Sequence, residues 1–347
     1  MTERRLYLDV GVGETRGVVT LDGRPERLLI SRDDDLERQA LGAEVVGRVR
    51  KVERQLALAF IDLGEGPDGV LNLRPEMGRL VEGQAVRVEI RSEARAGKGA
   101  SLRLVGEGEG PPRLLVAAPS IEAELGGVAS RAQIVTGGVA RAMADGAEAE
   151  ALETVFPLPG GGTVAIEATR ALIAIDVDLG DRGGSDPKRA TRAANFAALA
   201  TAARVLRLKG EGGLVVIDLA GRGHDGPALI SGARLAFGPD NPGVAFGPIS
   251  RFGTLELTVP RRRRSIADRL LDEVGQPTAE TLALRLIRQI EREATADPGA
   301  RIEAAAAPDV AAAADAYLKA LTDRFGARLT LRADPLRPRT DPEVKPV

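Results

Sequence analysis

Two apolar segments that each end in aspartate, separated by a helix-like stretch, constrain the fold of this chain most strongly. Residues 173–178 read IAIDVD and residues 214–218 read LVVID, and residues 194–208 between them carry apolar side chains at helical spacing. A strand, a helix and a second strand form a right-handed crossover, which makes the two strands parallel with their carboxyl ends at one edge of a sheet. The pattern predicts an α/β subdomain with its active site at that edge.

Three aspartates lie at the ends of these two runs. Asp176 and Asp178 are two residues apart, so they lie on one face about 7 Å apart, while Ile175 and Val177 point into a core. If Asp218 lies on the neighbouring strand, three carboxylates crowd one place and need a proton or a cation. Oxygen ligands favour Mg²⁺ or Mn²⁺. For either segment alone, the alternative is that aspartate simply suits a turn. Together they predict a metal site.

Residue usage excludes several kinds of chemistry. The chain has no cysteine and one histidine, His224, which excludes disulfides, thiolate zinc sites, cysteine nucleophiles and multi-histidine metal centres. Basic and acidic residues number 48 and 50, for a net charge of −2, so a site for a polyanion must be a local patch. The one dense basic cluster is Arg261-Arg262-Arg263-Arg264, which is either a phosphate contact or solvated surface.

Short strands with turn signals dominate the first third of the chain. Residues 1–40 predict a small β unit with a hairpin at Asp22-Gly23, and we expect residues 113–152 to complete it. Residues 41–106 hold five strand-like runs, which predict a small β-barrel of the OB type. Residues 107–112, rich in glycine and proline, predict a linker.

The remaining chain divides into three parts. Residues 153–270 carry the strand–helix–strand pattern and form the predicted catalytic subdomain. Residues 277–334 contain a helix with an apolar stripe and an alternating strand, which predict a small α/β domain. Residues 335–347 are rich in proline and charge and are predicted to be a disordered tail.

Apolar runs are short throughout. The first residues show no apolar signal core, and no segment approaches the roughly 20 apolar residues that cross a bilayer. We therefore expect a cytoplasmic protein without a membrane partner.

Several motifs resemble the ribonuclease E/G family of bacterial endoribonucleases. They are Pro159-Gly160-Gly161-Gly162, the AIDVD run at 174–178, the stretch from Asn195 to Asp218, and Ile249-Ser250-Arg251-Phe252-Gly253. Residues 45–105, including Lys98-Gly99-Ala100, resemble the family's OB-fold domain, and residues 278–290 resemble its small domain.

This resemblance implies a magnesium-dependent endoribonuclease that cuts single-stranded RNA and leaves 5′-phosphate and 3′-hydroxyl ends. It implies an OB-fold RNA-binding domain, a DNase I-like α/β catalytic subdomain, a small C-terminal α/β domain, and an N-terminal remnant of an RNase H-like unit. Asp176 and Asp218 would bind Mg²⁺, with Mn²⁺ as the alternative, and Asp178 would join them in catalysis. No histidine or tyrosine is expected to act as an acid or base. The expected RNA-binding residues are Phe60, Lys98, Arg251, Arg261, Arg262, Arg263 and Arg264. The alternatives are a core role for Phe60 and a solvated loop charge for Lys98.

The sequence also departs from the family pattern. Asp178 stands where the family usually has Asn, Gly221 where it commonly has an acid, and Arg170 where it has Glu. Without cysteine the family's zinc link cannot form, so we expect no zinc, and any homodimer would lack that link. Residues 113–152 are too few for the family's 5′-monophosphate sensor. Two rival functions stay open: an RNA-binding protein that does not cut, and a metal-dependent DNase or phosphatase.

Overall fold

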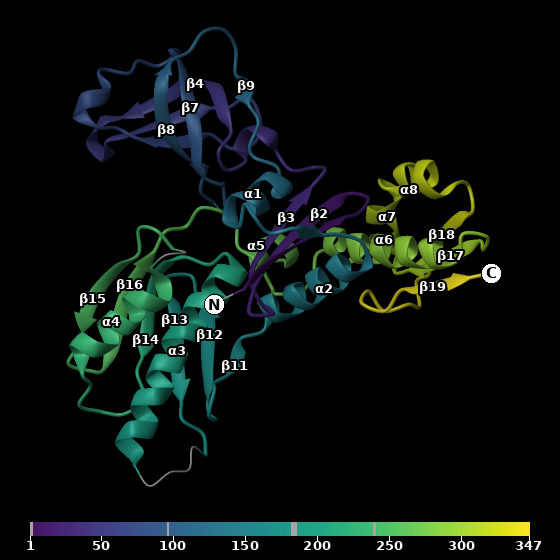
Figure 1. Cartoon of the computed structure of the whole chain (residues 1–347). Coiled ribbons are helices and arrows are strands. Elements are labelled where there is room, and N and C mark those ends of the chain that lie inside the picture. Colours follow the sequence, from purple (N-terminus) through teal and green to yellow (C-terminus); the bar gives the residue numbers. More distant parts are fainter. Residues whose placement is uncertain (1–2, 96, 182–185, 239–240) are drawn as a thin grey trace.

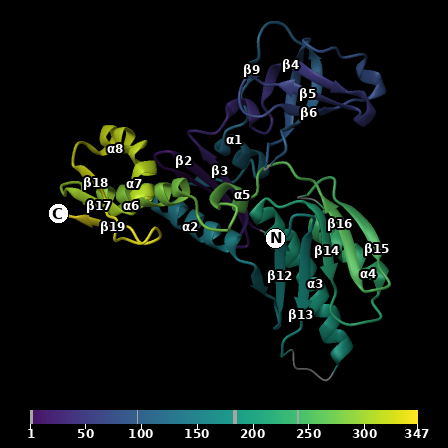
Figure 2. The ribbon, with the colours of Figure 1, turned by 180° about the vertical axis from the view of Figure 1, so that it is seen from behind.

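The protein has a mixed α/β architecture of four sheets, seen in a computed structural model that describes residues 3–95, 97–181, 186–238 and 241–347. Figures 1 and 2 show three bodies, a barrel, a six-stranded sheet with its helices and a C-terminal α/β unit, arranged around a central N-terminal sheet. None of the described helices is both long and apolar enough to cross a membrane.

The predicted strand–helix–strand unit lies in the six-stranded sheet, whose order is β11-β12-β13-β14-β16-β15. β13 and β14 are parallel, and the other neighbouring pairs are antiparallel. Helices α3 and α4 pack on one face. The elements are β11 (Val155–Pro157), β12 (Thr163–Ala168), β13 (Ile173–Asp178), α3 (Pro187–Lys209), β14 (Gly213–Asp218), α4 (Gly226–Phe237), β15 (Ala245–Ile249) and β16 (Thr254–Val259).

Local sequence explains where α3 begins and ends. The Asp186 side chain accepts a hydrogen bond from the Arg189 amide, and Pro187 occupies the first turn, where its missing N–H costs nothing. Gly210 ends the helix with φ +66°, a conformation that glycine adopts without strain. Small side chains such as Ala198 and Ala202 are buried against the sheet, so the helix packs closely on it.

A closed barrel of five strands is consistent with the predicted OB-like domain. The strand order is β5-β6-β8-β7-β4, and pairing of β4 with β5 closes it. A further strand, β9, extends β4, so the chain adds to the barrel after the glycine-rich segment. The elements are η1 (Glu37–Gln39), β4 (Glu44–Glu53), η2 (Arg54–Leu56), β5 (Leu58–Asp62), β6 (Gly69–Asn72), η3 (Pro75–Met77), β7 (Ala85–Ser92), β8 (Ser101–Glu107) and β9 (Arg113–Val116).

The central sheet joins segments that are distant in sequence. β1, β2 and β3 form consecutive hairpins, and β10 pairs with β1 in parallel after the chain returns from the barrel. Helices α1 and α2 pack against this sheet, and α5 contacts α2. The elements are β1 (Arg4–Val10), β2 (Glu14–Leu21), β3 (Arg24–Arg32), α1 (Ile121–Val128), β10 (Ile134–Val135), α2 (Gly138–Leu152) and α5 (Ile266–Leu270).

The C-terminal unit is a three-stranded sheet with helices, and here the predicted disordered tail is wrong. β19 pairs antiparallel with β17, and Arg301 and Val347 exchange two backbone hydrogen bonds of 3.1 and 2.8 Å. Composition gave the wrong prediction because strand pairing uses backbone N–H and C=O groups. Charged side chains and nearby prolines do not prevent these backbone hydrogen bonds. The elements are α6 (Ala279–Ala296), β17 (Ile302–Ala306), α7 (Pro308–Asp315), α8 (Leu318–Phe325), β18 (Leu329–Ala333) and β19 (Glu343–Pro346).

A buried ionic cluster joins the central sheet, α2 and α6. Arg16, whose side chain is fully buried, lies 2.6 Å from Asp9 and 3.1 Å from Glu148. Arg288 of α6 lies 2.6 Å from Glu14 and 3.3 Å from the same Glu148. Burial alone would raise the pKa of Glu148, but the arginines that surround it outweigh burial and lower that pKa. Glu148 therefore holds two bodies together through charge.

We expect Glu148→Gln to lower the free energy of unfolding at pH 7 by about 3–5 kcal/mol, because it leaves buried guanidinium groups unpaired. A lowered pKa stabilises the fold above the unfolded-state pKa, and this contribution is lost as pH falls through the folded-state value. The difference in the free energy of unfolding between the variant and the wild type should therefore become smaller below about pH 4.3. Urea denaturation across pH measures it. The exposed Glu122→Gln on α1 is the control, and an equal loss in both variants would contradict the account.

Candidate active site at the paired aspartates

The parallel register of β13 and β14 places Asp176 directly opposite Asp218. Neighbouring strands lie about 4.8 Å apart, so both carboxylates leave the same sheet face at the same level. Both side chains are exposed, whereas the preceding Ile175 and Ile217 are buried beneath α3. The alternation of the strands thus separates a solvated acidic face from the helix-covered core.

The third aspartate stands apart from this pair. Asp178 lies one dipeptide further along β13, opposite Thr163 rather than β14, and its carboxylate accepts a hydrogen bond of 2.9 Å from the Gly180 amide. Within the described part of the chain no three acidic or histidine side chains gather closely enough to hold a metal. The expectation that three carboxylates crowd one place is therefore wrong, because β14 ends at Asp218 and has no residue opposite Asp178.

A buried amide fixes the loop that follows Asp218. Asn195 of α3 accepts a hydrogen bond of 3.0 Å from the Ala220 amide and donates one of 3.1 Å to the Ala220 carbonyl. The next residue, Gly221, has φ +84°, and a Cβ there would lie 2.8 Å from Thr191 Cγ2. An acid at position 221 would be strained and crowded, which explains the glycine.

The β15–β16 hairpin brings an exposed aromatic side chain beside Asp218. Thr254 pairs with Asp218 in register, and the Leu219 amide donates to the Gly253 carbonyl at 3.4 Å. At the hairpin turn the Arg251 guanidinium lies 4.6 Å from the ring centre of Phe252. Phe252 is 77% exposed, while the other six phenylalanines are buried or half-buried. Phe252 belongs to a motif identified in the sequence, but the sequence did not predict that its side chain is exposed.

The single histidine, His224, also lies beside this hairpin, and the expectation that no histidine acts as an acid or base stays a prediction. A Cβ on Gly253 would lie 3.3 Å from His224 Nε2, so the imidazole packs directly against the turn. Its Nε2 atom is buried and has no hydrogen-bond partner within the residues described. His224 is six positions after Asp218 in the sequence, and only the path of the loop brings it to the hairpin.

The arginine run lies at the opposite end of these strands. Val259 of β16 pairs with Gly213, the first residue of β14, whereas Asp218 is the last. Five residues of strand separate the two ends, about 17 Å. Arg261–Arg264 therefore lie away from the acid pair, and their predicted contact with RNA stays a prediction.

Several of these arginines instead bind the protein itself. The Arg261 side chain donates to the Gly212 carbonyl. Arg263 forms an ion pair of 2.5 Å with Glu124 on α1, and its guanidinium is 3.6 Å from Glu93 beside the barrel. The run therefore ties three bodies together at their junction.

In the barrel, both predicted RNA-binding residues face outward. Phe60 is half-buried on β5 between Ala59 and Ile61, which are fully buried in the barrel core. Strand alternation puts its ring on the outer face, which excludes the core alternative. Lys98 is exposed in the loop between β7 and β8, where its backbone pairs with Arg95.

The acid pair suits a hard cation. Mg²⁺ commonly takes one or two protein carboxylates and completes its shell with water and substrate phosphate oxygens. Asp176 and Asp218 supply two exposed carboxylates on one sheet face. The donor chemistry therefore fits Mg²⁺ or Mn²⁺.

Residues 139–264 match the model of the Ribonuclease E/G family, a span that runs from α2 through the acid pair and the hairpin to the arginine run. This part of the chain is similar to that family. Ribonuclease E of Buchnera aphidicola is 32% identical over 148 residues, which cover 40% of this chain and 16% of that protein. Ribonuclease E of Escherichia coli is 34% identical over 148 residues, which cover 40% of this chain and 14% of the relative.

Ribonuclease G of Escherichia coli is 28% identical over 176 residues, which cover 47% of this chain and 35% of the relative. The chain thus spans about a third of ribonuclease G and about a sixth of the ribonuclease E relatives. The family match contains Asp176, Asp218, Asn195 and Phe252, and it leaves the barrel outside.

We expect Asn195→Leu to lower the free energy of unfolding by about 1–3 kcal/mol, because the Ala220 amide and carbonyl lose their buried partners. Chemical denaturation gives the value. Asn72→Leu, the same change at an exposed barrel position, should alter stability by no more than about 0.5 kcal/mol. Equal losses for the two variants would show that the Asn195 bonds do not hold the loop.

Proposed function

We propose that this protein is a magnesium-dependent endoribonuclease of the ribonuclease E/G family that cleaves single-stranded RNA and leaves 5′-phosphate and 3′-hydroxyl ends. The observation that carries the proposal is the register of Asp176 opposite Asp218 on an open sheet face. Names of the matched relatives, ribonuclease E and ribonuclease G, support the activity. The cytoplasm is its proposed location.

Asp176 and Asp218 would hold the cation through one carboxylate oxygen or more each. A bound Mg²⁺ or Mn²⁺ supplies a polarised phosphate and an activated water at neutral pH. Asp178 would act beside the pair through its second carboxylate oxygen, since the first accepts a hydrogen bond from the Gly180 amide. In our proposal Asn195 is a positioning residue, because it holds the Leu219–Ala220 backbone that follows Asp218.

Exposed aromatic and basic groups favour single-stranded RNA as the substrate. The Phe252 ring beside Asp218 offers a face for a base, and Arg251, stacked on it, is within reach of a backbone phosphate. Phe60 and Lys98 offer a second platform on the barrel. Bases in a duplex are already stacked, so such platforms select unpaired nucleotides.

A second candidate function is RNA binding without cleavage. It is favoured by the absence of a third acid at the pair within the described residues and by the glycine at position 221. The barrel and the Phe252 hairpin would serve either function, so the acid pair alone distinguishes them.

We expect Asp176→Asn and Asp218→Asn each to reduce cleavage of a 5′-labelled single-stranded RNA by at least about 100-fold, because each removes a cation ligand. Gel analysis with magnesium and with EDTA measures this, and EDTA should abolish cutting by the wild type. Asp315→Asn, an exposed acid on α7, is the control. Parallel assays use single-stranded DNA and a small phosphate ester. Unchanged cleavage by either site variant would overturn the assignment, and tight binding without cuts would select the second function.

We expect Phe252→Ala to weaken RNA binding by about 1–3 kcal/mol without loss of stability, because it removes an exposed stacking face. Fluorescence anisotropy in the Asp218→Asn background measures binding in the absence of cleavage. Phe60→Leu should show a similar loss at the barrel. Leu336→Ala, another exposed apolar side chain at 94% exposure, should bind as the parent does. If the Asp218→Asn parent and the three variants bind RNA equally well, neither phenylalanine ring contacts the RNA.

A further inference from the structure

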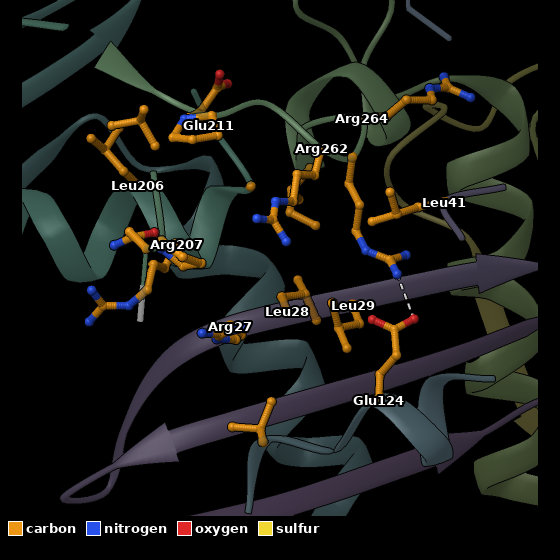
Figure 3. Close-up of a pocket in the computed structure, with 18 of the residues that line it drawn as sticks. Arg27, Leu28, Leu29, Leu41, Glu124, Leu206, Arg207, Glu211, Arg262 and Arg264 are labelled. Atoms are coloured by element: carbon orange, nitrogen blue, oxygen red, sulfur yellow. Dashed lines mark hydrogen bonds and ion pairs between the residues drawn. The ribbon is translucent and has the colours of Figure 1, made fainter. Parts of the chain in front are cut away.

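A second polar cavity lies away from the paired aspartates, at the junction of the central sheet, α1, the end of α3 and the arginine run (Figure 3). Its volume is about 500 Å³, within the range of small-molecule sites. It opens near Gly210 and Val259, at the end of β14 and β16 opposite to Asp218. The nuclease proposal makes no use of it.

The charged lining is mainly positive. Two glutamates, Glu124 and Glu211, face five arginines: Arg27, Arg207, Arg262, Arg263 and Arg264. Burial raises the pKa of Glu124 despite the opposing Arg263, and burial followed by Asp268 raises the pKa of Glu211. Both shifts favour the neutral form of the glutamates, so the arginines supply most of the charge in the lining. The balance of the lining favours an anion.

Arg262 is the side chain best placed to meet such an anion. Its backbone carbonyl accepts a hydrogen bond of 2.8 Å from the Glu93 amide, which holds the residue at the cavity. Its guanidinium forms no hydrogen bond or ion pair within the described residues, in contrast to Arg263, which pairs with Glu124. Figure 3 shows Arg262 between the end of α3 and the strand that carries Leu28, while Arg264 points outward.

One wall of the cavity is apolar. The apolar lining residues that keep some exposure are Leu29 of β3 and Val128 of α1, which pack against the same core cluster, and Pro260 after β16. A guanidinium matches a phosphate through two parallel hydrogen bonds, and an apolar wall accommodates a base or sugar. An inorganic anion would leave that wall without contact. A ligand with a phosphate at one end and a flat apolar body at the other would satisfy both parts.

We propose that this cavity binds a free nucleoside monophosphate, with its phosphate on Arg262 and its base against the wall formed by Leu29 and Val128. The site is separate from the acid pair, so binding does not depend on nuclease activity. Because Arg263 of the same cavity bridges α1 and the barrel side, a bound nucleotide also lies where three bodies meet.

Calorimetric titration of the full chain with AMP, adenosine and inorganic phosphate tests the proposal. We expect saturable binding of AMP and at least tenfold weaker binding of adenosine and of phosphate alone. Arg262→Ala should weaken AMP at least tenfold, since a charge-assisted pair is lost. Arg262→Lys should weaken it as well, because an ammonium lacks the bidentate fork. A thermal melt of each variant establishes that it is folded.

Two controls separate this site from others. Arg301→Ala, an exposed arginine of the C-terminal unit, and Asp218→Asn should bind AMP as the wild type does. Saturating single-stranded RNA should leave AMP affinity unchanged in the Asp218→Asn protein. The proposal is overturned if AMP fails to saturate, if Arg262→Ala binds normally, or if Asp218→Asn loses AMP. Displacement of AMP by RNA would likewise overturn it and assign the cavity to the RNA path.

Discussion

The parallel pairing of β13 with β14 is the constraint on which the candidate site depends. A right-handed crossover through α3 brings the two strands side by side, and the register then sets Asp176 opposite Asp218. Strand alternation means that a slip of one residue would turn one carboxylate into the helix-covered core. Ile175 and Ile217 are both buried in the core beneath α3. Burial of these two side chains therefore fixes the register of the strands as well as the fold.

Charge holds together the bodies around this site. The cluster of Arg16, Glu148 and Arg288 joins the central sheet to α2 and to the C-terminal unit, while Arg263 joins α1 to the barrel side. A buried ion pair adds little net stability, yet removing one partner is costly because the other charge stays buried. Such clusters therefore specify how bodies dock more than they strengthen the docking.

The surroundings of the acid pair differ from the family pattern in ways that the fold explains. At position 221 the left-handed backbone and the nearby Thr191 leave no room for an acid. Instead, the hairpin supplies Arg251, Phe252 and a contact with His224 at the same edge. The candidate site thus consists of a pair of acids and a neighbouring aromatic turn, and Asp178 lies beside β12.

Periodicity and residue type by themselves determined the strand–helix–strand unit, the barrel and the aspartates that end the strands, because these depend on local alternation and on short-range turn chemistry. Contacts between distant segments needed the tertiary structure. The strand pairing of β19, the position of His224 against Gly253 and the docking of Arg263 on Glu124 each join residues whose spacing carries no pattern. The placement of the arginine run was likewise undecided, because a strand's direction in a sheet follows from its partner. The sequence named the candidate groups, and long-range packing decided which of them meet.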